Sequence, residues 1–307
     1  MNYINLIFLN VILPILILMA IGVFAQKKLR LQLGPISKLL TYCFMPATVF
    51  LNMYQAQFDY RLLSQLFFYL LLFSSSLIVL SRLLSKVLKI EREESITLKN
   101  SISLMNSGNY GLPVSQLIFS ANPLGVSIQI IVLIFQNLLT YTYGIYNLLS
   151  ATKSAADILN SFIRLPIIHA LLLGIIFRLF NLSLPTFALV PIEHLSNGFV
   201  ALALFLLGAQ FADIKLNLFH RVIAWSLVGR LIAGPALAFL FITLLRIDGV
   251  MAQSLLIASS FPTSRKTATL ALEHDVAPEL AAQVVLYSTL LSGVTVTVVI
   301  YLSKLLF

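Results

Sequence analysis

Two adjacent basic residues, Arg265 and Lys266, lie inside an otherwise apolar stretch of the chain. A charge at the centre of a membrane helix costs about 2.5–3.5 kcal/mol on insertion scales, so two of them need a compensating role. A guanidinium binds a carboxylate through two parallel hydrogen bonds, and an ammonium acts as a point charge. The pair therefore predicts a binding site for an anion. The alternative is that one or both side chains reach the membrane surface.

Two segments carry helix-breaking residues where a membrane span is expected: SLMNSGNYGLPVSQL at 103–117 and FPTSRKTA at 261–268. Non-helical backbone survives at that depth only where protein or a watery cavity meets its polar groups. Paired interruptions indicate a substrate site near the midplane, where half-helix N-termini favour an anion. The alternative for each is a simple kink. The predicted site residues of the two breaks are Asn106, Gly108, Asn109, Gly111, Pro113, Pro262, Thr263, Ser264, Arg265 and Lys266.

Other polar residues within apolar stretches could line the same cavity or bond neighbouring helices. These are Asn52, Gln55, Gln136, Asn137, Tyr287 and Ser288. Arg230 is expected to bond backbone carbonyls near Pro235, and His169 to relay protons or to pack as a hydrogen-bonded side chain. The eleven acidic residues fall in loops or at span ends, so neither a buried proton relay nor a sodium site has a candidate. No metal or other cofactor is predicted.

Composition places these residues in a membrane. The chain of 307 residues is 59% hydrophobic and 10% charged, whereas soluble domains carry about 25% charged residues. The net charge of +9 is scattered through loops between apolar runs, which favours the lipid bilayer as partner and excludes nucleic acid. The single Cys43 excludes an intrachain disulfide framework.

The sequence predicts an all-α membrane protein with ten spans, since about 20 apolar residues cross the hydrocarbon. Basic residues concentrate in alternate loops, which places both termini outside a bacterial inner or plasma membrane. The predicted spans are 5–25, 36–55, 62–85, 95–119, 123–149, 159–180, 191–211, 219–245, 250–273 and 279–304.

A weak internal repeat relates the two halves of the chain. LPILILMAIG at 13–22 resembles LPIIHALLLG at 165–174, and AQF at 56–58 recurs at 209–211. A nearly constant displacement also relates residues 106–113 to residues 261–268. Five spans in each half force the second half to run upside down, as in many secondary transporters. The predicted units are 1–152 and 153–307.

GNYGLPVSQLIF, FPTSRKTATLALEHDVAPELAAQVVLYSTLLSG and the opening spans are similar to the auxin efflux carrier family, which is related to the bile acid/sodium symporter fold. The resemblance implies an elevator mechanism, with helices 1, 2, 6 and 7 as scaffold and helices 3–5 and 8–10 as transport domain. It also implies two broken helices that cross at the substrate, and bacterial members carry anions such as malate or malonate. Thr267 replaces a proline of the plant pattern, and the basic pair Arg265–Lys266 departs from it, so the exact substrate is not carried over.

These features predict a secondary transporter of small organic anions, with efflux driven by membrane potential. One alternative is an anion symporter coupled to protons or sodium. Others are an intramembrane serine enzyme, with Ser107 or Ser264 beside His169, and a sensor that does not transport. No phosphate-binding loop for ATP is present in the sequence. The oligomeric state is left open, with a homodimer among the options.

The predicted topology is tested by single cysteines in a Cys43→Ser background. Asn2→Cys and Lys153→Cys are expected to react with an impermeant reagent from opposite sides of the membrane, because an odd number of spans separates them. Labelling of both cysteines from the same side would contradict the inverted arrangement of the halves.

Overall fold

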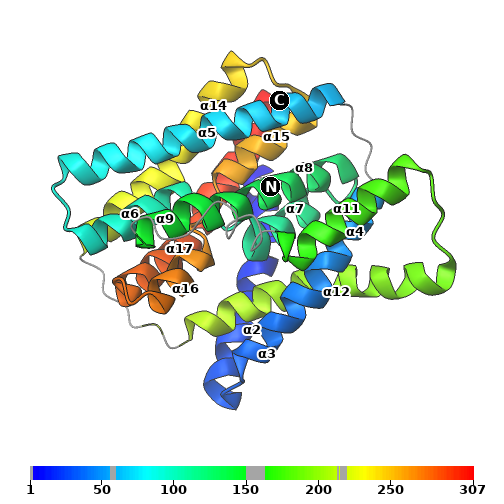
Figure 1. Ribbon diagram of the computed structural model, residues 1–307, viewed down its shortest axis with the longest axis horizontal. Helices are drawn as coiled ribbons and strands as arrows, with labels where there is room; N and C mark the ends of the chain where they lie inside the picture. Colours follow the sequence, from blue (N-terminus) through cyan, green and yellow to red (C-terminus); the bar gives the residue numbers. More distant parts are fainter. Residues whose placement is uncertain (1–2, 56–59, 150–162, 213, 215–219) are drawn as a thin grey trace.

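The computed structural model describes most of the chain, and every regular element in the described part is helical (Figure 1). The described residues are 3–55, 60–149, 163–212, 214 and 220–307. Three features noted in the sequence lie outside the described residues. They are the AQF run at 56–58, the boundary between residues 152 and 153, and the first residues of the predicted span 159–180.

The elements include several π-helical turns, labelled η, within longer helical runs. In chain order they are α1 (Tyr3–Ile7), η1 (Phe8–Ile12), α2 (Leu13–Leu29), α3 (Leu33–Leu39), η2 (Leu40–Phe44), α4 (Met45–Gln55), α5 (Tyr60–Val87), α6 (Arg92–Ser103), η3 (Ser107–Gly111), α7 (Leu112–Ile118), α8 (Pro123–Leu139), η4 (Thr140–Gly144), α9 (Ile145–Leu149), α11 (Pro166–Leu179), α12 (Thr186–Phe211), α13 (Arg221–Leu227), η5 (Val228–Ala233), α14 (Gly234–Leu244), α15 (Gly249–Ser259), α16 (Arg265–Glu273) and α17 (Pro278–Leu306).

Six helical segments in the described part are long and apolar enough to cross a membrane, which makes the chain a multi-pass membrane protein. They correspond to six of the predicted spans and are Asn5–Leu29, Leu62–Val87, Pro123–Leu148, Thr186–Phe211, Arg221–Leu244 and Pro278–Leu306. The predicted span 191–211 begins five residues too late, because Pro191 lies inside α12 and does not end it. Proline is tolerated in membrane helices.

Of the other four predicted spans, three are shorter or interrupted in the structure. Span 95–119 stops after Ser103 and resumes in η3, and span 250–273 stops after Ser259 and resumes in α16. These are the two interruptions that the glycine, proline and polar residues predict. Span 159–180 is represented by α11, and span 36–55 lies within the helical elements α3, η2 and α4.

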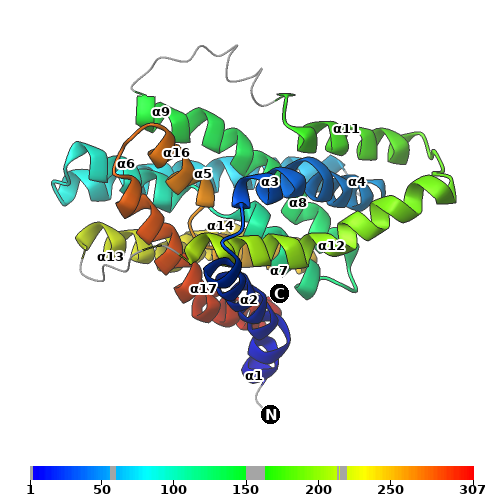
Figure 2. The same ribbon diagram turned by 90° about the horizontal axis from the view of Figure 1, so that it is seen from below.

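Two helix pairs approach each other closely enough that only glycine fits at the contact. A Cβ atom on Gly22 of α2 would lie 2.9 Å from the amide nitrogen of Ala209 in α12. A Cβ atom on Gly174 of α11 would lie 2.9 Å from the carbonyl oxygen of Phe50 in α4. Small residues allow such backbone contact between membrane helices. As a result, α2, α4, α11 and α12 pack largely against one another (Figures 1 and 2).

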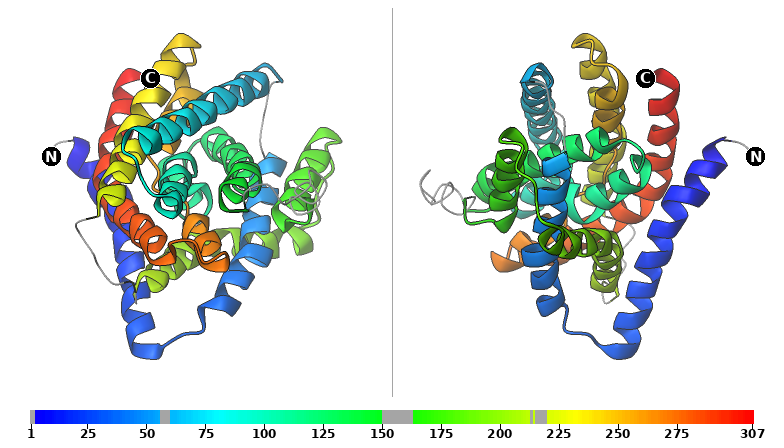
Figure 3. Two further views of the ribbon diagram at one scale, coloured as in Figure 1. Left: turned by 60° about the vertical axis from the view of Figure 1, so that its left-hand side comes forward. Right: turned by 90° about the vertical axis from the view of Figure 1, so that its right-hand side faces the viewer.

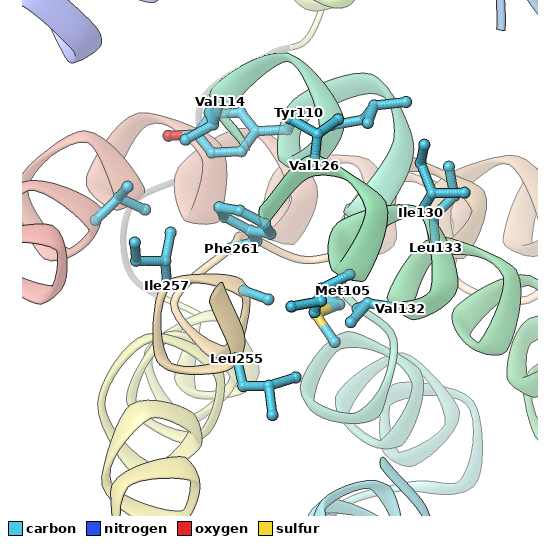
Figure 4. Close-up of a cluster of buried hydrophobic side chains, with 14 of the residues drawn as sticks. Met105, Tyr110, Val114, Val126, Ile130, Val132, Leu133, Leu255, Ile257 and Phe261 are labelled. Atoms are coloured by element: carbon cyan, nitrogen blue, oxygen red, sulfur yellow. The ribbon is translucent and has the colours of Figure 1, made fainter. Parts of the chain in front are cut away.

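The remaining helices surround the two breaks. α15 packs against α8, α14 and α17, while α6 packs against α5 and α13. α17 also runs beside the N-terminal helices α1 and η1 (Figure 3). At the centre, the rings of Tyr110 and Phe261 meet edge to face, with their centroids 5.9 Å apart. Figure 4 shows the two rings among aliphatic side chains such as Val114 and Ile257. The breaks therefore lie inside a packed apolar core.

The glycine contacts are tested by adding one methyl group. Gly22→Ala and Gly174→Ala are each expected to lower the free energy of unfolding by about 1–3 kcal/mol, because backbone atoms cannot move aside for the methyl group. Gly293→Ala is the control, because its Cβ would meet Ile12 at an ordinary 3.5 Å. The measurement is the thermal unfolding midpoint of the detergent-solubilised protein. Equal midpoints for all three variants would contradict the close approach.

Candidate functional site

The two interrupted segments pair with each other through their backbones. The amide of Asn106 donates to the carbonyl of Pro262 at 2.8 Å, and the amide of Ser264 donates to the carbonyl of Leu104 at 2.8 Å. Between these bonds, Met105 and Thr263 form an antiparallel bridge. The two bonds are reciprocal: they pair Asn106 with Pro262 and Leu104 with Ser264. Each break thus satisfies polar groups that the other exposes.

We call the place where the two breaks pair, at Met105 and Thr263, the crossing. Side chains from neighbouring helices satisfy further backbone polar groups there. The amide of Thr263 donates to the hydroxyl oxygen of Ser288 at 3.1 Å, and the Thr263 hydroxyl donates to the carbonyl of Ser101 at 3.0 Å. The amide of Met105 donates to Oε1 of Gln136 at 3.2 Å. These bonds hold both breaks in a fixed position relative to α8 and α17.

Arg230 supports the crossing from the side of α6 and α15. Its side chain is fully buried, and it donates from Nη1 to the carbonyl of Ile102 at 2.9 Å and from Nη2 to the carbonyl of Ser259 at 2.6 Å. The expectation that Arg230 bonds backbone carbonyls is correct. The carbonyls belong to the ends of α6 and α15, however, and not to residues near Pro235.

A cavity of about 90 Å³ lies beside the crossing. It is enclosed by both breaks, by α8 and η4, and by residues of η2, α4 and the start of α11. Its lining residues are Thr41, Met45, Met105, Asn106, Ser107, Gly108, Asn109, Leu133, Gln136, Asn137, Thr140, Leu165, Pro166, Ile167, Ser264, Arg265 and Lys266.

The cavity carries two basic side chains, and none of its described lining residues is acidic. The Arg265 guanidinium has no hydrogen-bond or ion-pair partner among the described residues. The Lys266 ammonium donates to Oδ1 of Asn137 at 2.5 Å and lies 4.8 Å from the centre of the Tyr141 ring. Both contacts are to uncharged groups. They fix the position of the Lys266 ammonium but do not neutralise its charge. An anion would supply the missing negative charge.

Three buried polar atoms in the cavity wall have no partner among the described residues: Nδ2 of Asn106, Oγ of Ser107 and Nε2 of Gln136. Buried polar groups are normally bonded, so unsatisfied ones call for a ligand or water. The half-helices that begin at Ser107 and Arg265 also direct their N-terminal ends toward the cavity, and the Ser264 hydroxyl accepts from the Lys266 amide at 3.3 Å. Free donors and helix N-termini are the groups that bind carboxylates.

Much of the remaining cavity wall is apolar. A Cβ atom on Gly108 would lie 3.4 Å from Cε of Met45 and 3.3 Å from Cδ1 of Leu133, so Gly108 leaves the space between them open. Leu165, Pro166 and Ile167 add further apolar surface. The arrangement suits a small ligand with an anionic end and an uncharged body.

The structure brings eight of the predicted site residues to this cavity: Asn106, Gly108, Asn109, Gln136, Asn137, Ser264, Arg265 and Lys266. The others lie outside its lining. Ser288 and Thr263 bond the crossing, and Gly111 passes close to the Phe261 ring. Pro113 lies in the first turn of α7, and Pro262 accepts from Asn106.

Three further predicted residues lie in other surroundings. Asn52 donates to the carbonyl of Thr48 on its own helix at 2.8 Å, and Gln55 is exposed at the end of α4. Tyr287 packs against Ile223 and Val284. Sequence reasoning did not assign the lining residues Ser107, Thr41 and Thr140 to the ligand site. Ser107 lies within the predicted break, whereas the two threonines give no signal in a single sequence.

His169 does not line the cavity with Ser107 and Ser264. It is exposed on α11, and its Nδ1 lies 3.2 Å from the carbonyl oxygen of Leu165. A base must reach the nucleophile that it activates. This placement disfavours the serine enzyme considered from the sequence.

The fold and the cavity together define a multi-pass membrane protein with a cationic site at two crossed helix breaks. The family model for membrane transport proteins matches residues 7–300, so the chain belongs to this family, the auxin efflux carrier family. The resemblance found in the sequence is therefore confirmed. An uncharacterized transporter of Methanocaldococcus jannaschii is 28% identical over 299 residues, which cover 92% of this chain and 95% of the relative.

Two alanine variants distinguish a residue that contacts the ligand from a residue that supports the crossing. Asn109→Ala is expected to weaken ligand binding while changing the free energy of unfolding by less than about 1 kcal/mol, because Asn109 lines open space. Ser288→Ala is expected to lower that free energy by about 1–3 kcal/mol, because it leaves the buried Thr263 amide unpaired. Ligand titration and thermal unfolding in detergent measure the two effects. If Asn109→Ala prevents folding, Asn109 is structural and not a ligand contact.

Proposed function

We propose that this protein is a secondary transporter of small organic anions, with carboxylates as the substrate class. The observation that carries the proposal is the Arg265 guanidinium, which lines the cavity without a partner among the described residues. Holding an uncompensated charge in a membrane segment is costly, so a function must maintain it. The neighbouring unpaired donors of Asn106 and Gln136 support a ligand rich in acceptor oxygens.

The proposed architecture is two inverted halves of five spans, residues 1–152 and 153–307. Two observations support it. The Gly22 contact with α12 has a counterpart in the Gly174 contact with α4, and the backbone bonds at the crossing are reciprocal. Inverted repeats place a substrate site at their interface, beside discontinuous helices. The cavity occupies that position.

We further propose that transport proceeds by an elevator movement. α2, α4, α11 and α12 form the scaffold, and α5–α9 together with α13–α17 form the transport domain. The cavity supports this division, because Thr41, Met45 and the start of α11 supply one wall and the crossing supplies the other. Movement of one group past the other would carry the cavity across the membrane.

The proposed driving force is the membrane potential of an inner or plasma membrane. One charge gains about 2.3 kcal/mol per 100 mV, and an inside-negative potential drives an anion outward. None of the described cavity-lining residues is acidic, so the site offers no carboxylate to carry a coupled proton. This charge distribution supports our proposal of export as a uniport.

The proposal is tested by transport in proteoliposomes with a panel of mono- and dicarboxylates. An inside-negative diffusion potential is expected to accelerate efflux of at least one carboxylate from right-side-out vesicles. Arg265→Gln is expected to abolish this efflux, because the carboxylate loses its bidentate partner. Arg178→Gln is the control, since Arg178 is exposed in the last turn of α11 and does not line the cavity.

Two outcomes would contradict parts of the proposal. Efflux that ignores the potential but follows a proton or sodium gradient would replace uniport with ion coupling. Equal efflux by the wild-type protein and the Arg265→Gln variant would show that Arg265 is not the anion-binding residue.

A further inference from the structure

Arg230 joins the C-terminal ends of two half-helices that come from different parts of the chain. α6 ends at Ser103 and α15 ends at Ser259, and one guanidinium bonds a carbonyl of each at 2.9 Å and 2.6 Å. The C-terminal end of a helix carries about half a negative charge, from its aligned peptide dipoles and unsatisfied carbonyls. The two ends together therefore present about one negative charge, and Arg230 supplies one positive charge.

Arg230 has no carboxylate partner among the described residues, and its printed hydrogen bonds go to the two helix ends. A buried guanidinium without a carboxylate is unusual, because burying a charge is costly unless it is paired and hydrogen-bonded. If only hydrogen bonds were needed at these carbonyls, a neutral donor would serve, as the Thr263 hydroxyl does at the carbonyl of Ser101. A cation at this position points to an electrostatic role.

The helix ends that Arg230 neutralises lie close to the cavity. Met105 lines the cavity and lies three residues after Ile102, whose carbonyl accepts from Arg230. Three residues of extended chain span at most about 10 Å. At that separation a unit charge inside a protein changes the affinity for a monovalent ion by roughly tenfold. An uncompensated charge at the helix ends would therefore repel an anion in the cavity.

We propose that Arg230 is a positioning residue that makes the crossing electrostatically one-sided. It cancels the negative ends of α6 and α15, so that a ligand in the cavity experiences only the positive ends at Ser107 and Arg265 and the two basic side chains. This inference rests on the proposed function, because it concerns the affinity of the same site for anions. It adds a residue that lies outside the described cavity lining yet determines how strongly the site favours negative charge.

A purely structural role makes a different prediction. If Arg230 only holds the two half-helices in place, its loss distorts the cavity and weakens all ligands of one shape alike. If its charge matters, the loss grows with the charge of the ligand. Succinamide, succinamate and succinate have the same carbon skeleton and carry no charge, one negative charge and two negative charges, so they separate the two roles.

The experiment compares Arg230→Gln with Arg230→Lys by titration of the three compounds against the detergent-solubilised protein. In Arg230→Gln, affinity is expected to fall roughly tenfold for succinamate and roughly a hundredfold for succinate, relative to any change for succinamide. Arg230→Lys keeps the charge with a smaller head group, and its affinities for both anions are expected to stay within about threefold of wild type. Arg178→Gln removes a charge elsewhere and is expected to leave all three affinities unchanged.

Equal losses for the three compounds in Arg230→Gln would overturn the inference and leave a structural role. If Arg230→Gln fails to fold while Arg230→Lys folds, the charge is required for folding itself, and the inference that it acts on the anion affinity of the cavity is overturned. If the wild-type protein binds neither these anions nor any carboxylate of the transport panel, the proposed function fails, and the inference fails with it. That result is distinct from the other two, because it appears before any variant is compared.

Discussion

The structure depends on one constraint: backbone amides and carbonyls released within a membrane must find partners other than water. Both interrupted helices release such groups where they cross. The chain satisfies them by bonding the two breaks to each other, from Asn106 to Pro262 and from Ser264 to Leu104, and by bonding the helix ends to Arg230. The polar atoms that remain without partners belong in part to the cavity wall. The site is thus the place where the internal pairing of the crossing is left incomplete.

The sequence is informative about the breaks because breaking a membrane helix requires distinctive residues. Glycine and proline at 108–113, and proline beside polar residues at 262–264, indicate interrupted helices, and they do so more strongly together than either segment does alone. Arg265 and Lys266 are equally informative, because charge is rare at that depth. The structure has helical breaks at both places and brings the basic pair to the cavity. These features follow from local chemistry, which a single sequence contains.

The partners of these residues could not be predicted in the same way. Serine and threonine in membrane helices bond either their own backbone or a neighbouring helix, and periodicity does not distinguish the two. Asn52 bonds its own helix, whereas Ser288 bonds the distant break at Thr263. The contact of Lys266 with Asn137 and Tyr141 joins segments far apart in the chain.

The close contacts at Gly22 and Gly174 have a consequence for biogenesis. Gly22 belongs to the first proposed half and meets α12 of the second, while Gly174 belongs to the second half and meets α4 of the first. Each proposed half therefore packs its first helix against a helix of the other half. During synthesis, α2 is made long before α12. The glycine-containing face of α2 therefore stays uncovered until α12 is in the bilayer. Assembly of this protein is consequently a late event, because α2 can pack against α12 only when most of the chain has left the ribosome.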